Sequence, residues 1–472
     1  MRTSFAAAVV RTVPGGARAR FAPLAALMRS VLLDRDDRSV SRRVALITFA
    51  ARAVSAAILY VSQVLLARWM GDFQYGIFVV VWVAAVILGS LGCLGINVAV
   101  LRFVPEYGER GEASLLRGII LGSRVQGFVA ATLLAAIGAA GLALFGGHIS
   151  SYHLIPLYLG AVTLPMMAIG EIQDGLARAF NWANAATAPT YIIRPLLILA
   201  FMAFAVAAGA APDAATAMAA VIAATYLTTI GQLIWLKRRT DRVVPPGPRR
   251  YLPLTWFVVA LPMFVVEGFF FLLTNVDVLI VGQLMEPDQA GVYYAATRTL
   301  ALVNLVYFAV RSGGARRFSQ YYAAGDTARL ASFARDTLHW TFWPSLLMVG
   351  FLAVAGKPLL LLFGPSFGAG YPLLLILSIG LLARASIGPA ETLLIMAGQQ
   401  RACAVVYMSA FVLNVIFNFA LIPVLGLAGA ATATTLVLVG ETLALYAITA
   451  ARLGIRCSIV TVFRPPRPSE AP

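Results

Sequence analysis

Twelve apolar stretches, each about as long as a membrane-spanning helix, occupy most of this chain between residues 44 and 452. A helix needs about 20 apolar residues to cross a bilayer, because every backbone N–H and C=O must be bonded within the segment. We predict spans at residues 44–67, 77–101, 118–145, 153–177, 186–209, 214–236, 254–281, 291–314, 336–362, 371–396, 402–423 and 428–451. The composition agrees, since 60% of the residues are hydrophobic and only 12% are charged. An all-α polytopic membrane protein with 12 transmembrane helices is therefore predicted.

The basic residues fall almost entirely in alternate connections between the predicted spans. The first 43 residues, the connection at 237–250, the connection after the eighth span and the C-terminal tail are rich in arginine, whereas the outer connections carry only Arg68 and Lys357, near helix ends. Short loops with an excess of lysine and arginine stay in the cytoplasm, so both termini are predicted to be cytoplasmic. The formal net charge of +16 is then a determinant of orientation, and we expect no nucleic-acid partner.

A linker rich in proline and arginine divides the predicted spans into two groups of six. Its residues Pro245, Pro246, Gly247 and Pro248 make a stiff connection. The predicted parts are a basic cytoplasmic tail at 1–43, an N-terminal six-helix lobe at 44–236, a cytoplasmic linker at 237–253, a C-terminal six-helix lobe at 254–452 and a cytoplasmic tail at 453–472. Two bundles of similar size are therefore expected.

An internal repeat relates the two predicted lobes. A shift of 215 residues without a gap, from position 70 to position 285, superposes eight identical residues that gather at two connections. They are Met70, Gln74, Gly76, Arg102, Phe103, Tyr107, Ala113 and Leu115 in the first copy, and Met285, Gln289, Gly291, Arg317, Phe318, Tyr322, Ala328 and Leu330 in the second. Because six spans separate the copies, both have the same orientation, which predicts a pseudo-twofold axis along the membrane normal.

Several motifs resemble those of a known family. The stretch Leu65-Leu-Ala-Arg-Trp-Met-Gly-Asp-Phe-Gln-Tyr-Gly-Ile-Phe, followed by residues 94–97 and 101–107, resembles the opening of the polysaccharide-biosynthesis flippases of the multidrug/oligosaccharidyl-lipid/polysaccharide exporter superfamily. Residues 360–374, Met396-Ala-Gly-Gln, Asn414-Val-Ile-Phe-Asn and residues 423–431 resemble its C-terminal half. The resemblance implies that the chain moves a lipid-linked oligosaccharide across the bacterial cytoplasmic (inner) membrane by alternating access between two lobes, for surface polysaccharide biosynthesis.

Arginines inside the predicted spans are the candidates for binding such a cargo. A polyprenyl-linked oligosaccharide carries an anionic phosphate or diphosphate, and a guanidinium grips phosphate oxygens in a two-pronged geometry. Charged residues inside a membrane are costly unless they face a cavity or a partner. The candidates are Arg52, Arg124, Arg194, Arg298 and Arg384. The alternative is that these arginines extend to the headgroups or hold helices together.

Carboxylates inside the spans are the candidates for ion coupling. Glu267 and Glu441 lie near mid-span, and Glu391 and Asp277 lie in spans ten and seven. A carboxylate in the membrane suits proton coupling, and it equally suits a static pair with one of the arginines. In contrast, Glu171, Asp174 and Arg178 follow one face of the fourth span, and there we expect a solvated local ion cluster near the cytoplasmic mouth.

Two alternatives to the flippase interpretation stay open. A cation-coupled multidrug extrusion transporter of the same superfamily would favour acidic cavity residues, whereas the first span carries Arg52 and no carboxylate. A membrane-embedded enzyme is least favoured, because such enzymes need a sizeable extramembrane loop and the outer connections are short. We therefore expect a transporter and no catalytic residues.

The expected partners follow from the flippase interpretation. They are the lipid-linked oligosaccharide, the membrane lipids, protons or sodium ions as coupling ions, and glycan polymerase machinery. No phosphate-binding P-loop is present in the sequence, so the energy is expected from ion gradients, the membrane potential or consumption of product. Cys93, Cys403 and Cys457 lack metal-ligand spacing, and we expect no metal and no cofactor.

Overall fold

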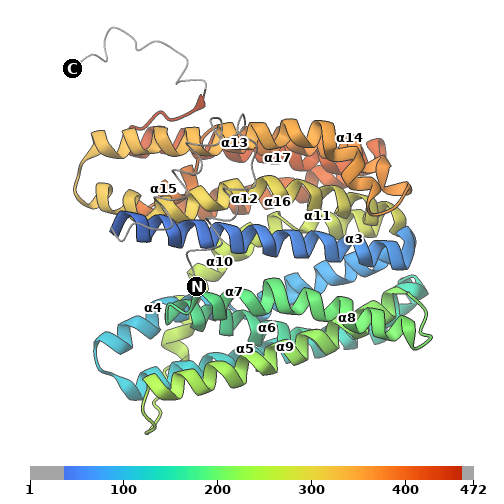
Figure 1. Cartoon of the computed structure of the whole chain (residues 1–472), viewed down its shortest axis with the longest axis horizontal. Helices are drawn as coiled ribbons and strands as arrows, with labels where there is room; N and C mark the ends of the chain where they lie inside the picture. Colours follow the sequence, from blue (N-terminus) through green and yellow to red (C-terminus); the bar gives the residue numbers. More distant parts are fainter. Residues whose placement is uncertain (1–36, 460–472) are drawn as a thin grey trace, which may run out of the picture. The chain divides into compact units, whose positions relative to one another are not determined.

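The regular structure of the described residues is entirely helical (Figure 1). The computed structural model describes the backbone of residues 37–459 and the side chains of residues 54–459 except 148, 266–267, 304–306, 308–309, 311–313 and 316. The chain divides into two units, Met1–Ala56 and Ala57–Pro472. Helices α4 to α17 and all but the start of α3 belong to the second unit.

The first half of the chain, up to the loop after Val243, contributes α3 (Asp37–Gly92), α4 (Ile96–Glu109), α5 (Ala113–Phe145), α6 (Ser151–Ala179), α7 (Ala183–Ala188), α8 (Arg194–Ala207) and α9 (Ala214–Val243). The second half contributes α10 (Pro253–Leu273), α11 (Val276–Leu284), α12 (Pro287–Ala323), α13 (Thr327–Leu361), α14 (Tyr371–Ala385), α15 (Ala390–Met396), α16 (Gln400–Leu425) and α17 (Leu427–Leu453). Short η1 (Gly146–His148), η2 (Pro189–Ile193) and η3 (Ser366–Gly370) lie between them.

Each predicted span corresponds to one of these helices or to a broken pair. Ten stretches of the described residues are long and apolar enough to cross a membrane, and one of them, Val54–Glu109, contains both of the first two predicted spans. The eighth predicted span lies in α12, which is not among the ten. The number of predicted spans is therefore matched by the helices, whereas several boundaries differ.

One backbone break separates the first two predicted spans, and others divide the seventh and the tenth. In α3 the helix breaks at Gly71, whose φ of 75° is in the left-handed region that glycine adopts without strain. The seventh span divides into α10 and α11, and the tenth divides into α14 and α15 at Gly388 and Pro389. Gly388 has a φ of 61°, and proline cannot donate a hydrogen bond to the preceding turn. The break separates α14 from α15 within one membrane-spanning stretch, residues 366–396.

The helices pack mainly within each half of the chain. In the first half α5 packs on α6, and α6 and α8 both pack on α9, and these helices lie side by side in Figure 1. In the second half α16 and α14 both pack on α17, and α12 packs on α13. Helix α10 contacts α16 of its own half and also α4 of the first half. It therefore connects the two groups of helices.

The two copies of the repeat meet at a tightly packed seam. A side chain on Gly76 would overlap the carbonyl oxygen of Pro287, and a Cβ atom on Gly291 would lie 3.3 Å from the backbone nitrogen of Gly76. Equivalent residues of two related halves come together only near the axis that relates them. Tyr75, fully buried beside this seam, contacts the ring of Tyr294 with 6.3 Å between centroids. The seam therefore has the geometry that a twofold repeat predicts.

Candidate functional site

Buried charged residues gather in two clusters, one in each half of the chain. We call Glu171, Asp174, Thr190, Arg194 and Gln232 the acidic cluster, and Arg384, Glu391, Tyr407 and Glu441 the ion-pair cluster. Both lie inside the membrane-spanning helices, where each charge must be matched or hydrogen-bonded. The two clusters differ in how they meet that requirement.

Neutral hydrogen-bond donors hold the carboxylate of Asp174 in the acidic cluster. The hydroxyl of Thr190 donates to Asp174 Oδ2 over 2.7 Å, and Gln232 Nε2 donates to Asp174 Oδ1 over 2.7 Å. Thr190 lies in η2, where Pro189 interrupts the regular helix, and Gln232 lies on α9. Three successive spans therefore supply one carboxylate and its two donors. The expected solvated cluster is wrong for Asp174, which is buried because α9 and η2 cover that face of α6.

Glu171 lies one turn before Asp174 on α6 and faces α4. Asn97 Nδ2 donates to its carboxylate over 3.4 Å, and the thiol of Cys93 lies 3.7 Å from the same oxygen. Arg194, at the start of α8, interacts electrostatically with both carboxylates. Its guanidinium also lies 5.6 Å from the centre of the Trp82 ring, a cation–π distance. The arginine is thereby held between the acidic cluster and α3.

Opposite charges are in direct contact in the ion-pair cluster. Arg384 Nη2 lies 2.8 Å from Glu391 Oε2 and 3.6 Å from Glu441 Oε1. The side chains of Arg384, Glu391 and Glu441 are only 10%, 1% and 0% exposed, so the pair and its third member are shielded from water. Arg384 lies in the last turn of α14 and Glu391 in the first turn of α15, so their contact spans the break between the two helices. Tyr407, on α16, donates its hydroxyl proton to Glu391.

Two aromatic rings also surround Arg384, and some polar atoms of Arg384 and Glu441 have no described hydrogen-bond partner. The guanidinium carbon lies 5.4 Å from the Phe270 ring centre and 5.1 Å from that of Tyr307. Neither carboxylate oxygen of Glu441 accepts a hydrogen bond from a described residue, and Arg384 Nε likewise has no described partner. Two carboxylates share one guanidinium, so the cluster has one more negative group than positive groups.

A third charged pair lies beside the seam between the two halves. Tyr293 donates its hydroxyl proton to Asp277 Oδ2 over 2.7 Å, and Asp277 is buried. Arg298, one turn further along α12, interacts electrostatically with Asp277 and with Tyr75 across the seam. Its guanidinium lies 4.5 Å from the Tyr294 ring centre, and its Nε has no hydrogen-bond partner among the described residues. Arg298 is therefore fixed in place while part of its binding capacity is unused.

The remaining predicted residues are placed less centrally or are not described. Arg124, on α5, is half-buried near Asp241 of α9, and its Nε and Nη2 atoms have no described hydrogen-bond partner. The side chains of Arg52 and Glu267 lie outside the described residues. Of the predicted arginines, Arg194, Arg298 and Arg384 thus have a defined charged environment, each in a different place, and they do not converge on one site.

Polar side chains within apolar spans are the sequence signal that could have indicated the acidic cluster. Asn97, Thr190 and Gln232 each interrupt a run of apolar or small residues, and each contacts a carboxylate in the structure. Their positions in three different spans gave no indication that they meet on α6. Among the described side chains, no group of three histidine, cysteine or acidic residues is placed to hold a metal ion.

Two protein-family models match the sequence of this chain. The family model described as Polysaccharide biosynthesis protein matches residues 41–313, which is more than half of the chain. The family model described as MatE matches residues 262–420. No curated protein matches the chain.

Solved structures of transporters share the fold. An inward-facing multidrug resistance MATE family transporter of the MOP superfamily is similar with a TM-score of 0.65 and 14% identity, over 85% of this chain and 93% of that one. Lipid II flippase MurJ in an inward closed conformation is similar with a TM-score of 0.65 and 16% identity, over 86% of this chain and 87% of the other. MATE in complex with MaD5 gives a TM-score of 0.66 and 13% identity, over 90% and 98%. The predicted all-helical, polytopic, two-bundle architecture is therefore confirmed.

Proposed function

Because this chain belongs to the family of polysaccharide biosynthesis proteins, we propose that it is a flippase for a lipid-linked oligosaccharide. The cargo carries a polyprenyl phosphate or diphosphate and moves from the cytoplasmic to the outer leaflet of the bacterial inner membrane by alternating access, for surface polysaccharide biosynthesis. The fold shared with MurJ, a flippase named for lipid II, supports this proposal.

The observation that carries the proposal is the guanidinium of Arg298 beside the seam between the halves. A phosphate cannot enter hydrocarbon without a compensating charge, and arginine supplies a permanent positive charge with several donors. Arg298 is oriented by the Tyr294 ring, and its Nε has no partner among the described residues. We assign the first contact with the cargo phosphate to Arg298. Arg194, near α3, is the first candidate in the other half, and Arg52 and Arg124 are further candidates.

The movement that we propose uses the two predicted lobes at 44–236 and 254–452 as its rigid parts. The seam at Gly76 and Gly291 is closed in this structure, since a Cβ atom on either glycine would contact the other half. Opening the seam would separate Arg298 from Tyr75 and give the cargo headgroup room beside the guanidinium.

The ion-pair cluster is the part of the second lobe that we propose for ion coupling. It has two carboxylates for one guanidinium, so one proton or one monovalent cation would neutralise Glu391 and Glu441 together with Arg384. Arg384 would then act through the coupling ion, and binding of the cargo phosphate would not be its first role. Asp277 and Glu267 remain candidates for the same task, with Asp277 near Arg298.

The experiment that tests the proposed function measures the cargo in cells. Deleting the gene should leave the lipid-linked repeat unit on the cytoplasmic leaflet, protected from an impermeant glycan-modifying reagent added outside. Complementation with the wild type and with Arg329→Gln, an exposed arginine paired with Asp326, should restore export, whereas Arg298→Ala should not. Unchanged export of every surface glycan in the deletion strain would reject the proposal.

A multidrug extrusion transporter is the second candidate, and the acidic cluster favours it. The match of the MatE family model to residues 262–420 and the shared fold of MATE transporters support the same candidate. Two carboxylates inside one lobe, Glu171 and Asp174, suit a cationic drug better than a phosphate. Increased sensitivity of the deletion strain to cationic dyes, together with normal glycan export, would favour this alternative.

A further inference from the structure

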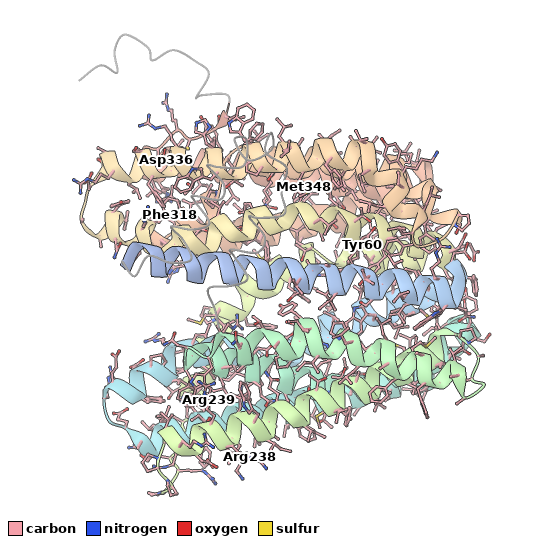
Figure 2. All side chains as sticks on the ribbon, viewed as in Figure 1. Tyr60, Arg238, Arg239, Phe318, Asp336 and Met348 are labelled. Carbon is pink, nitrogen blue, oxygen red and sulfur yellow. The ribbon has the colours of Figure 1, made fainter. Side chains whose placement is uncertain are left out.

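We propose that the end of α9 carries a binding site for the phosphate headgroup of an anionic bilayer phospholipid. The site consists of Arg238, Arg239 and Arg242 with the indole rings of Trp182 and Trp235, and we call it the arginine–tryptophan site. It lies at the end of the membrane-spanning helix α9, where Figure 2 labels Arg238 and Arg239. The inference goes beyond the proposed function, because it concerns binding of a lipid and requires no transport.

The first argument is that the side chains on one face of α9 change from apolar to basic toward the C-terminal end of the helix. Ile230, Ile234, Arg238 and Arg242 follow one another at intervals of four residues, so they lie in one row on the helix. Ile230 is 43% exposed and Ile234 is 47% exposed. A membrane-spanning helix exposes such apolar side chains to lipid tails. The row therefore passes from the level of the hydrocarbon to arginines at the level of the headgroups.

The second argument is the way in which Arg239 is held. Its guanidinium lies 4.6 Å from the Trp182 ring centre and 5.7 Å from the Trp235 ring centre, both within the cation–π range. Trp182 is itself fixed, because it stacks on Phe180 with 4.7 Å between ring centres and an interplanar angle of 16°. Asn181, between the two rings, has a φ of 58°, which asparagine tolerates better than most residues.

The third argument is that the three arginines have no carboxylate partner among the described residues. Among the ion pairs of the described residues, none involves Arg238, Arg239 or Arg242. The neighbouring Asp241 interacts with Arg124. The three arginines and Trp235 line a hollow at the surface. Arginines held by rings keep their N–H donors for an anion, and two or three such groups match the oxygens of one phosphate.

We propose a lipid, and not a soluble anion, because of the residues around the hollow. A soluble phosphate would meet the same donors, but only a lipid also covers the exposed apolar row at Ile230 and Ile234. Tryptophan is the aromatic residue typical of the boundary between headgroups and hydrocarbon, and Trp235 is 44% exposed there. Basic residues near a membrane surface bind anionic lipids with about 1 kcal/mol each, so three of them select strongly against zwitterionic lipid.

The test is a lipid titration of the purified full-length chain by native mass spectrometry. Phosphatidylglycerol is the anionic probe and phosphatidylcholine is the zwitterionic one. The triple variant Arg238→Gln, Arg239→Gln, Arg242→Gln should bind phosphatidylglycerol at least about tenfold more weakly than the wild type. The matched control is Arg102→Gln, Arg110→Gln, Arg329→Gln, which removes the same charge from exposed arginines paired with carboxylates and should change binding by less than about twofold.

A second pair of variants separates a site from a loose accumulation of charge. Trp182→Leu removes the ring that orients Arg239 without changing any charge and should weaken binding by about threefold, whereas Trp182→Phe keeps a ring and should stay near the wild type. Should the triple variant not fold, Trp182→Leu and Arg242→Gln still decide the matter.

Three outcomes would overturn the proposal. The first is an equal loss of binding in the control variant, which would show that only net charge matters. The second is equal affinity for phosphatidylcholine. The third is complete displacement of phosphatidylglycerol by inorganic phosphate at the same concentration, which would make the hollow a site for a free anion. Transport activity enters none of these measurements, so failure of the flippase proposal would leave the result interpretable.

Discussion

The acidic cluster and the ion-pair cluster occupy corresponding places in the two halves of the chain. The first draws on the fourth, fifth and sixth spans, and the second draws on the tenth, eleventh and twelfth. In the first, Asp174 is held by neutral donors, Thr190 and Gln232. In the second, Arg384 touches two carboxylates directly. Corresponding spans of the two halves thus bury charge in two different ways, with neutral donors in the first half and direct ion pairs in the second.

The difference predicts how each cluster responds to the loss of one partner. A buried carboxylate with neutral donors loses one charge-assisted hydrogen bond when a donor is removed, which costs about 1.5–3 kcal/mol. A buried ion pair that loses one partner leaves an uncompensated charge, which costs about 3–5 kcal/mol. The ion-pair cluster should therefore be more sensitive to substitution than the acidic cluster.

The largest expected effect is that of Arg384→Leu. It leaves Glu391 and Glu441 without their guanidinium, so the free energy of unfolding should fall by about 3–5 kcal/mol and the protein should become less abundant. Chemical unfolding in detergent, followed by tryptophan fluorescence, measures the change. The triple variant Arg384→Leu, Glu391→Gln, Glu441→Gln should recover much of the loss. An Arg384→Leu protein as stable as the wild type would remove the contrast between the clusters.

The next largest effect is expected for Arg298→Ala. Because Arg298 belongs to neither cluster, this variant distinguishes a loss of transport from a loss of stability. Loss of a charge-assisted contact with phosphate is worth about 1.5–3 kcal/mol, so export should fall about tenfold to a hundredfold at unchanged abundance. Arg298→Lys should give an intermediate rate, because lysine offers a point charge in place of a two-pronged donor. A parallel fall in abundance and export would make Arg298 a structural residue.

A smaller effect is expected for Thr190→Val in the acidic cluster. The substitution removes one donor from Asp174 and keeps Gln232, so the free energy of unfolding should decrease by about 1.5 kcal/mol, the lower end of the range for a hydrogen bond to a charged group. The matched variant in the other half is Tyr407→Phe, which removes the hydroxyl that donates to Glu391 and leaves Arg384 in place. Equal losses of several kcal/mol in Thr190→Val and Arg384→Leu would contradict the proposed difference.

The smallest effect on the maximum rate is expected for Glu441→Gln. The side chain keeps its shape but cannot take up a proton, so export should lose its dependence on pH while the maximum rate stays within about threefold of the wild type. Export measured across neutral pH in complemented cells, with Asp174→Asn as the comparison from the acidic cluster, tests this. An unchanged pH profile in Glu441→Gln would return Glu441 to a static ion pair with Arg384.

The sequence predicted the spans well because length and hydropathy alone decide which segments can cross a bilayer. The repeat was equally informative, since Gly76 and Gly291, aligned by the shift along the sequence, lie together at the seam. The contact of Glu391 with Arg384 spans the break at Gly388 and Pro389. It depends on the left-handed backbone of Gly388 and could not be derived from spacing.

The environments of the buried charges could not be predicted from the sequence. Glu441 follows Arg384 by 57 positions, and their contact exists because α14 and α17 pack together. Asp174 was expected to be solvated, since local spacing shows only its own helix face. The donors that bury it come from η2 and α9, and hydropathy carries no information on how these elements rotate against α6.

The most direct test of the central claim is a flipping assay with purified protein in liposomes. The vesicles contain a polyprenyl-diphosphate oligosaccharide, and an enzyme or lectin added outside reports how much of it becomes accessible with time. The proposal predicts accelerated transfer by the wild type, at least about tenfold slower transfer by Arg298→Ala, and wild-type transfer by Arg329→Gln. Transfer no faster than in protein-free liposomes, with protein that is folded and correctly inserted, would contradict it.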